Sequence, residues 1–211
     1  MRVNTSTLRR AGAVMPMAMA AALCFAGTAN AAVSVNWSCQ ATVPNFGVQT
    51  SSMSTSVTTT APASVKTGTP ATITIAPGSS TVPLHPFPFV TVNNIHDMQM
   101  TIEVSNATID SASASGGTVS GTTAVVGNTV VLSVPASITG GTMYTPPAVT
   151  INVTAGAVPG PITSKYAGTS YSSPGMTFTT NLTVPLVGTS DATTSCYPNP
   201  SPTLTSTTIT T

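Results

Sequence analysis

Apolar and polar residues alternate along most of the chain beyond residue 32. In residues 33–40 (VSVNWSCQ), Val, Trp and Cys occupy every second position, with Ser, Asn and Gln between them. Successive side chains of a β-strand point to opposite faces, so this period of two predicts a half-buried strand with Trp37 and Cys39 in the core. Similar alternation, or a short apolar run in 129–134, predicts strands over 53–59, 71–75, 98–104, 129–134, 149–153, 176–184 and 207–209.

Glycine and proline mark turns between these segments, as at Pro77-Gly78 and Gly116-Gly117. The prolines beyond residue 32 fall at the ends of the predicted strands or between them, where they do not interrupt the central hydrogen bonds of a sheet. No segment has a convincing helical pattern. Short, evenly spaced strands predict an all-β fold, an antiparallel β-sandwich in a single domain. A division into two lobes near residues 111–117 (SASASGG) is the alternative.

The first thirty-one residues have the pattern of an export signal. Three arginines precede the mildly apolar residues 11–27, and residues 29–31 (ANA) form a small-x-small cleavage site. We therefore expect residues 1–31 to be a signal peptide and residues 32–211 to form the secreted domain. No apolar run reaches the roughly 18 residues that a membrane-spanning helix needs, so we expect no transmembrane segment in the mature chain.

Charged residues are unusually sparse, at 4% of the chain. Serine and threonine supply the polar surface instead, and the chain is threonine-rich. So few basic residues cannot form a nucleic-acid footprint, which excludes that class of partner. Disordered chains combine low hydrophobicity with high charge, and this chain has neither, so we expect it to fold. The expected mature chain has a formal charge of −2, from Lys66, Lys165, Asp97, Glu103, Asp110 and Asp191.

Cysteine usage indicates an oxidising compartment. Of the three cysteines, Cys24 lies in the expected signal peptide, which leaves Cys39 and Cys196. Two cysteines in an exported chain most simply pair, so we expect a disulfide between them. Two free thiols, or a mixed disulfide with a partner, are the alternatives at this point.

A search for catalytic chemistry finds no nucleophile elbow, zinc motif, phosphate loop or calcium loop. His96-Asp97 is the densest polar pair, and His85 is the other histidine. Alternation places Asp97 on the solvent face of its strand, so we interpret the pair as a solvated strand start. We predict no enzyme activity, catalytic residue, metal site or cofactor. A hydrolase with a scattered, histidine-dependent site is an alternative.

Four aromatic residues are candidates for a contact surface. Phe87 and Phe89 alternate with prolines in residues 82–90 (VPLHPFPFV), which are too proline-rich for a regular strand. Tyr144 and Tyr171 lie in turn-rich segments, where aromatic tips can contact a glycan or protein. Adaptable methionine side chains also suit a cavity for a lipid or steroid-like ligand; they are Met53, Met98, Met100, Met143 and Met176.

Residues 105–155 run through SASASGG, VVLSV and TPPAVTINVTA, and this stretch resembles bacterial Ig-like repeats. The wider frame, WSC at 37–39, PASVKTGTP at 62–70 and TSCYPNPSPTLTSTTI at 194–209, is similar to small secreted actinobacterial proteins with an Ig-like domain and no assigned activity. This resemblance implies an Ig-like β-sandwich at the cell envelope or outside the cell. It implies no catalytic residue.

The sequence therefore favours a non-catalytic exported protein, secreted or associated with the cell envelope. We expect it to act through contacts with an envelope or extracellular partner, self-association included, because its weak net charge gives little mutual repulsion. Its partner is not identified by the sequence. A carrier of an apolar ligand between the sheets is the second hypothesis, and the scattered-site hydrolase is the third.

Overall fold

The computed structural model describes residues 28–43, 46–156 and 160–211, and they contain strands and no helix. The predicted signal peptide lies almost entirely outside these residues, and its predicted boundary after Ala31 falls inside the first strand. The strands are β1 (Thr28–Val43), β2 (Gly47–Pro62), β3 (Ser64–Lys66), β4 (Pro70–Pro77), β5 (Ser80–Thr81), β6 (Thr91–Ser105), β7 (Ala107–Ser115), β8 (Thr122–Val126), β9 (Thr129–Val134), β10 (Ile138–Thr139), β11 (Met143–Tyr144), β12 (Ala148–Ala155), β13 (Pro161–Tyr166), β14 (Met176–Val184), β15 (Gly188–Pro198) and β16 (Thr205–Thr210).

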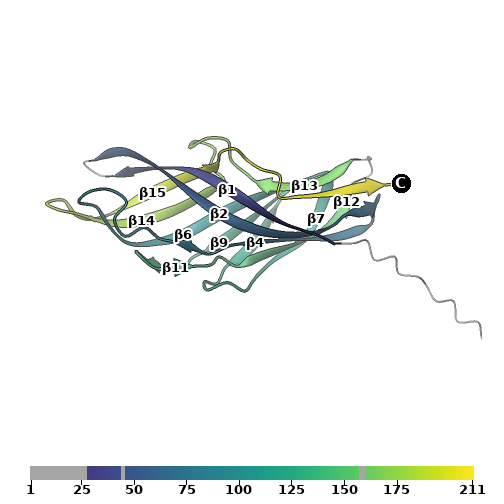
Figure 1. Ribbon diagram of the computed structural model, residues 1–211, viewed down its shortest axis with the longest axis horizontal. Helices are drawn as coiled ribbons and strands as arrows, with labels where there is room; N and C mark the ends of the chain where they lie inside the picture. The colour runs from purple at the N-terminus through teal and green to yellow at the C-terminus, as the bar shows by residue number, and fades with distance from the viewer. Residues whose placement is uncertain (1–27, 44–45, 157–159) are drawn as a thin grey trace, which may run out of the picture.

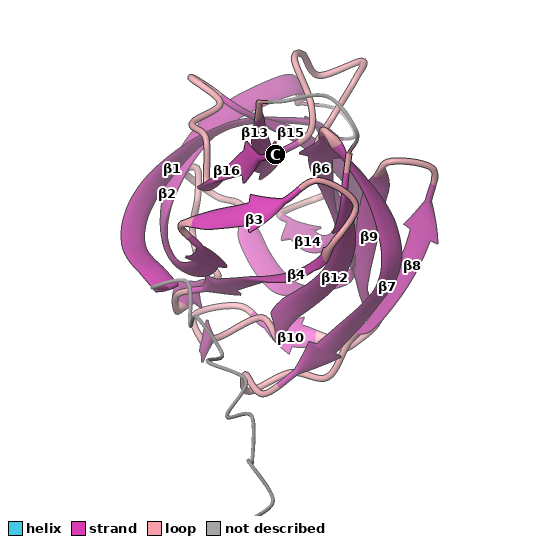
Figure 2. Ribbon diagram, turned by 90° about the vertical axis from the view of Figure 1, so that its right-hand side faces the viewer, coloured by secondary structure: helices cyan, strands magenta, loops and turns pink. Residues whose placement is uncertain are grey.

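One mostly antiparallel sheet of fourteen strands forms the body of the molecule. The neighbours β7-β12-β4-β2-β1-β15-β14-β6 follow one another across it, and β9 and β8 continue from the other edge of β6. The sheet curls so far that β8 comes close to β7, where the Thr123 hydroxyl donates a hydrogen bond to the Ala112 carbonyl at 2.9 Å (Figure 2). The curl gives one continuous sheet an inner and an outer face.

The inner face is the hydrophobic core. Trp37 is buried as predicted, and its ring lies 5.1 Å from that of Tyr166. Met98, Met100 and Ile102 also face inward, as the alternation in 98–104 predicts. The aliphatic residues of β4, β9 and β12 complete this interior with the alternating burial expected of strands with one covered face.

Two irregularities in β6 explain why its first half lacks a simple alternation. Opposite β14 the register shifts between Thr177 and Thr179 and again between Asn181 and Leu182. Asp97, at the first shift, has a φ of 53°, a left-handed conformation that Asp tolerates better than most residues. Each bulge changes which residues face inward, so the first half of β6 shows no regular period of two in the sequence. β6 therefore begins at Thr91, well before the predicted start at residue 98.

One end of the curled sheet is closed by the chain's last strand. β16 pairs with β13 and, in parallel, with β3, and these short strands lie across the end in Figure 2. Threonines here point inward but are satisfied: the Thr207 hydroxyl donates to the Pro62 carbonyl at 2.7 Å, and the Thr59 hydroxyl donates to the Leu204 carbonyl at 3.0 Å. Buried hydroxyls with partners add little penalty, so a threonine-rich chain can still form a core.

The predicted all-β fold and the Cys39–Cys196 disulfide are confirmed, the latter joining β1 to β15 directly across the ladder. An Ig-like arrangement stays a prediction, since a single sheet supplies both sides of the core. Eight of the strands in the described residues were not predicted from the sequence: β3, β5, β7, β8, β10, β11, β13 and β15. β7 includes residues 111–115 of the stretch that suggested a break between lobes, and only Gly116 and Gly117 of that stretch lie in the connection to β8.

Replacing both Cys39 and Cys196 with alanine should lower the free energy of unfolding by about 3–5 kcal/mol, because the bridge connects residues 157 positions apart and long closed loops restrict the unfolded chain most. Urea unfolding of the variant and of wild-type protein, with and without reductant, measures the loss. Reductant should leave the variant unchanged. An unchanged wild-type midpoint after verified reduction would contradict the prediction.

The Tyr166 hydroxyl is buried and has no hydrogen-bond partner within the described part of the chain. Tyr166→Phe removes this polar group and keeps the ring against Trp37, so the free energy of unfolding should stay constant or rise by about 1 kcal/mol. Trp37→Phe, which removes buried ring atoms, is the matched comparison and should lower it by about 2 kcal/mol. Chemical denaturation compares the two; a loss above about 1 kcal/mol in Tyr166→Phe would show that the hydroxyl is bonded.

Candidate functional site

A gap between β2 and its neighbour determines where the molecule is hollow. β2 pairs with β1 along its whole length, but β4 pairs only with Val57–Thr60 and ends at Pro77. Residues 47–56 of β2 therefore have no strand on their other edge among the described residues. The proline-rich segment 82–90 lines the same cavity as residues 51–53 of β2, and its isolated bridge, between Phe87 and Val90, lies within the segment. Proline cannot donate to a sheet ladder, so the segment covers the gap without sealing it.

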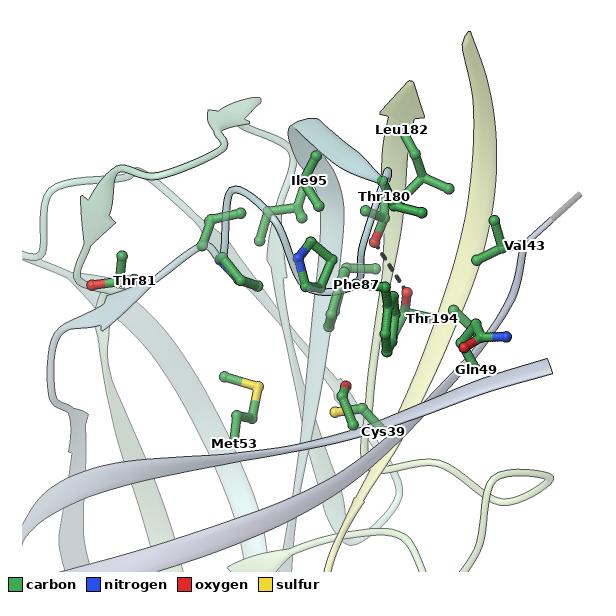
Figure 3. Close-up of a pocket in the computed structure, with 18 of the residues that line it drawn as sticks. Cys39, Val43, Gln49, Met53, Thr81, Phe87, Ile95, Thr180, Leu182 and Thr194 are labelled. Atoms are coloured by element: carbon green, nitrogen blue, oxygen red, sulfur yellow. Dashed lines mark hydrogen bonds between the residues drawn. The ribbon is translucent and has the colours of Figure 1, made fainter. Parts of the chain in front are cut away.

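The resulting cavity has a volume of about 330 Å³ (Figure 3). The ends of β1 and β14 that contribute to its lining lie at the end of the molecule opposite β16. Its walls come from β1, β2, β5, β6, β11, β14 and β15 and from the proline-rich segment. Cys39, with its disulfide, is one of the lining residues. The others are Ala41, Val43, Gln49, Ser51, Ser52, Met53, Thr81, Val82, Pro83, Pro86, Phe87, Val90, Val92, Ile95, Tyr144, Phe178, Thr180, Leu182 and Thr194.

The lining is mostly apolar and contains no charged side chain. Thr180 and Thr194, on neighbouring strands, are buried and share a hydrogen bond of 3.0 Å between their hydroxyls (Figure 3). The Gln49 amide donates to the Phe46 carbonyl at 2.8 Å and so helps to fix the turn between β1 and β2. Hydroxyl and amide groups are therefore the only polar groups that this site offers to a ligand.

Tyr144 is the titratable group of the cavity. It is 6% exposed, and burial raises the pKa of its hydroxyl to about 12, because the anion would lose its hydration. The phenol is therefore neutral at physiological pH and can exchange a hydrogen bond with a ligand but cannot pair with a cation.

The four expected contact residues occupy different environments. Phe87 is half-buried and Tyr144 buried, and both line the cavity. Phe89 is 80% exposed. Tyr171 is half-buried and packs edge-on against Tyr197, with the ring centroids 5.1 Å apart. The four aromatic residues therefore do not form one surface: two line the cavity, Phe89 is exposed near it, and Tyr171 belongs to a separate tyrosine pair.

The methionines are also divided. Met53 lines the cavity, as a ligand carrier would require. Met98, Met100 and Met176 are buried in the core, and Met143 is exposed. Only one of the five candidates therefore reaches the site.

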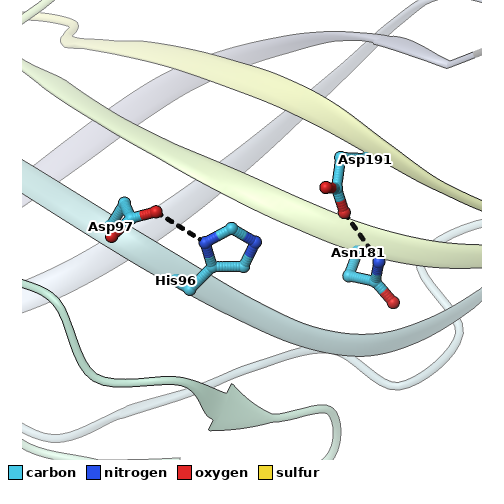
Figure 4. Close-up of polar contacts among 4 residues, drawn as sticks. All are labelled: His96, Asp97, Asn181 and Asp191. Carbon is cyan, nitrogen blue, oxygen red and sulfur yellow. Dashed lines mark hydrogen bonds and ion pairs between the residues drawn. The ribbon is translucent and has the colours of Figure 1, made fainter.

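Neither residue of the polar pair His96-Asp97 lines the cavity, although the pair follows the lining residue Ile95 in β6. Figure 4 shows the pair near Asn181 and Asp191 of the neighbouring strands. The His96 Nδ1 atom is 2.8 Å from an Asp97 carboxylate oxygen, and Asp97 is exposed, as the sequence predicts. His85 has Thr91 at 3.4 Å. Neither histidine contacts both a hydroxyl and a carboxylate among the described residues, which also contain no cluster of three or more His, Cys, Asp or Glu that could hold a metal. The described part of the chain therefore assembles no histidine triad of the kind that the hydrolase hypothesis requires.

Most cavity residues could not be singled out from the sequence. Ala41, Val43, Thr180, Leu182 and Thr194 are ordinary inward positions of alternating strands, and only the sheet's topology brings them together. The prolines in residues 82–90 were the one sequence feature that pointed to the site. They indicate that no regular strand forms there, but they do not indicate which residues line the cavity.

Comparisons with known proteins give little further guidance. No protein family and no curated protein matches the chain. A solved structure from Corynebacterium diphtheriae, described as membrane anchored, is similar over 86% of this chain and 38% of its own, with 18% identity and a TM-score of 0.47. The chain thus spans about two fifths of that protein. Separately, no helix in the described residues is long and apolar enough to cross a membrane.

Alkaline pH should destabilise the fold. Burial raises the pKa of Tyr144 to about 12 and that of Tyr166 above its usual value of 10.0, so the unfolded chain releases protons that the folded chain retains. The free energy of unfolding should be independent of these groups below about pH 9. Above pH 10 it should fall by up to about 1.4 kcal/mol per pH unit for each tyrosine. Urea unfolding across this range measures the slope, and Tyr144→Phe should reduce it; an equal slope in that variant would contradict the assignment.

Proposed function

We propose that this protein is a non-catalytic, extracytoplasmic binding protein that holds an uncharged, mainly apolar small molecule in its end cavity. The observation that carries the proposal is the apolar cavity of about 330 Å³ with no charge in its lining. Ligand sites in proteins typically have volumes of about 300–1,000 Å³ and apolar walls with a few polar groups. Protein interiors otherwise pack closely, with few voids larger than a water molecule.

The lining restricts the chemistry of the ligand. A carboxylate or phosphate buried here would find no cation, and an ammonium group would find no carboxylate. Burying an unpaired charge is strongly unfavourable, so such ligands are rejected. Thr180, Thr194 and Tyr144 offer neutral hydrogen-bonding groups among aliphatic and aromatic side chains. These features suit a single alkyl chain with a hydroxyl or ester head, or a small sterol-like ring system.

The setting follows from the cross-link and the expected export signal. Disulfides persist in oxidising compartments, and Cys39–Cys196 lies in the wall of the cavity itself. The resemblance to secreted actinobacterial proteins with an Ig-like domain also supports an envelope or extracellular location. Contact with a partner at the envelope, the leading expectation from the sequence, is compatible with a binding protein of this kind.

Fluorescence of Trp37 tests the proposal, because it is the protein's single tryptophan and lies two residues from Cys39 on the same face of β1. Titration with undecanol brominated at its terminal carbon should quench this fluorescence saturably, since bromine quenches at short range. The corresponding brominated carboxylic acid at pH 8 should bind at least about tenfold more weakly, because its charge has no partner. Absence of saturable quenching by the alcohol would refute the proposal; equal binding of alcohol and acid would refute the uncharged-ligand assignment.

A cavity-filling variant localises the signal. Ala41→Phe introduces a ring into the lining and should weaken alcohol binding by at least about tenfold through steric exclusion. Ala124→Phe adds the same ring at an exposed position of β8 and should change binding less than about twofold. Circular dichroism confirms that both variants fold. Equal binding by the two variants would place the ligand outside the cavity.

A further inference from the structure

We propose that the cavity end of the molecule docks on an uncharged lipid surface and that exposed apolar side chains around the cavity enter the lipid. This inference rests on the proposed function, because it names the surface from which the apolar ligand is taken or to which it is delivered. It is carried by the position, the backbone conformation and the lack of charge of those side chains.

Seven large apolar side chains are exposed on segments next to cavity-lining residues, and we call them the apolar rim. They come from Phe46 and the start of β2, the proline-rich segment, β11 and the β14–β15 turn. The end of β1, the start of β2 and the β14–β15 turn lie at the same end of the molecule (Figure 1). Scattered exposed apolar residues are ordinary, but a group gathered around a site marks an interaction surface. The rim comprises Phe46, Val48, Leu84, Phe89, Met143, Leu186 and Val187.

Two members of the apolar rim are held outward by an unfavourable backbone conformation. Phe89 has a φ of 65° and is 80% exposed, and Leu186 has a φ of 67° and is fully exposed. Left-handed conformations are rare for bulky residues and persist mainly where function requires them. Neither exposure nor this conformation stabilises the isolated fold, so both residues fit a role in contact with an apolar phase.

The two lysines of the described residues lie away from the apolar rim. Glu103 and Lys165 form an ion pair of 3.2 Å near the far end of β6, and Lys66 lies on β3, among the strands that close the opposite end. On the segments near the rim the titratable groups are His85, Tyr144, Asp191 and the His96-Asp97 pair, which follows the cavity-lining Ile95; the Asp191 carboxylate accepts a hydrogen bond of 2.6 Å from the Asn181 amide. Because neither lysine of the described residues lies there, this surface offers no lysine to an anionic headgroup. It suits the interface of a neutral bilayer, where burial of apolar side chains makes the free energy of binding more favourable.

The apolar rim is continuous with the cavity. Pro83 and Phe87 line the cavity on either side of Leu84 in the chain, and Val43 and Gln49 line it on either side of the β1–β2 turn. A ligand passing between these segments and a bilayer therefore meets apolar groups throughout. The arrangement removes the unfavourable step of exposing an alkyl chain to water.

Sedimentation with sucrose-loaded phosphatidylcholine vesicles tests docking with the purified, folded chain. Wild-type protein should bind, and binding should change less than about twofold between 0.05 and 0.5 M salt, because screening affects charge pairs and not apolar burial. Phe89→Ser with Leu186→Ser should lower the partition coefficient at least about tenfold. Val125→Ser with Val126→Ser, at the exposed β8–β9 turn, is the matched control and should change it less than twofold.

The same variants separate this proposal from the proposed function. Both double variants should retain quenching of Trp37 by brominated undecanol in solution, since none of the four positions lines the cavity. If brominated undecanol quenches Trp37 of the wild-type protein but the protein does not bind vesicles, only the docking proposal is overturned. If the wild-type protein binds vesicles but shows no quenching, only the proposed ligand site is overturned. Analytical ultracentrifugation tests whether the apolar rim instead binds a second copy of the chain. The proposal of lipid docking would be overturned if wild-type protein formed a dimer and did not bind vesicles, and if only the Phe89/Leu186 variant lost the dimer.

Discussion

Backbone hydrogen bonding along the edges of one long sheet determines where this protein is solid and where it is hollow. Each strand must find partners for its amide and carbonyl groups, and the paired strands of the sheet supply them to one another. The sheet curls until its edge strands β7 and β8 meet, where the Thr123 hydroxyl donates to the Ala112 carbonyl. At one end β16 and β3 complete the enclosure. At the other end β4 stops at Pro77 while β1 and β2 continue, so the interior opens there. The cavity is a consequence of unequal strand lengths, maintained by prolines.

The sequence predicted the strands whose inward positions carry large aliphatic or aromatic side chains. Trp37 and Ile151 belong to this group, because burial of one face leaves a clear period of two. It failed where inward positions carry small or hydroxylated residues, as in β7 and β15, since Ala112 and Thr194 do not differ in character from their outward neighbours. It failed at β6 because the bulge at Asp97 moves the pattern by one residue.

Prediction of the site was weaker for a related reason. Cavity walls are assembled from strands far apart in sequence, and register decides which positions meet. Thr180 and Thr194 form a pair only because β14 and β15 are joined by a tight turn. The disulfide was predictable because cysteine chemistry restricts the choice of partner. The division of Phe87 and Phe89 between cavity wall and solvent was not, since it depends on the left-handed conformation at Phe89.

The proline-rich segment also affects the thermodynamics of binding. Its ends are fixed by backbone hydrogen bonds, from the Val82 amide to the Thr142 carbonyl at 3.0 Å and from the Val92 amide to the Leu84 carbonyl at 2.9 Å. Its prolines have a restricted φ, so the segment samples few conformations before any ligand arrives. Little chain entropy is then lost on association, and the wall is preorganised. The affinity of such a pocket depends mainly on how well the ligand's shape fits it, because little free energy is spent on ordering the protein.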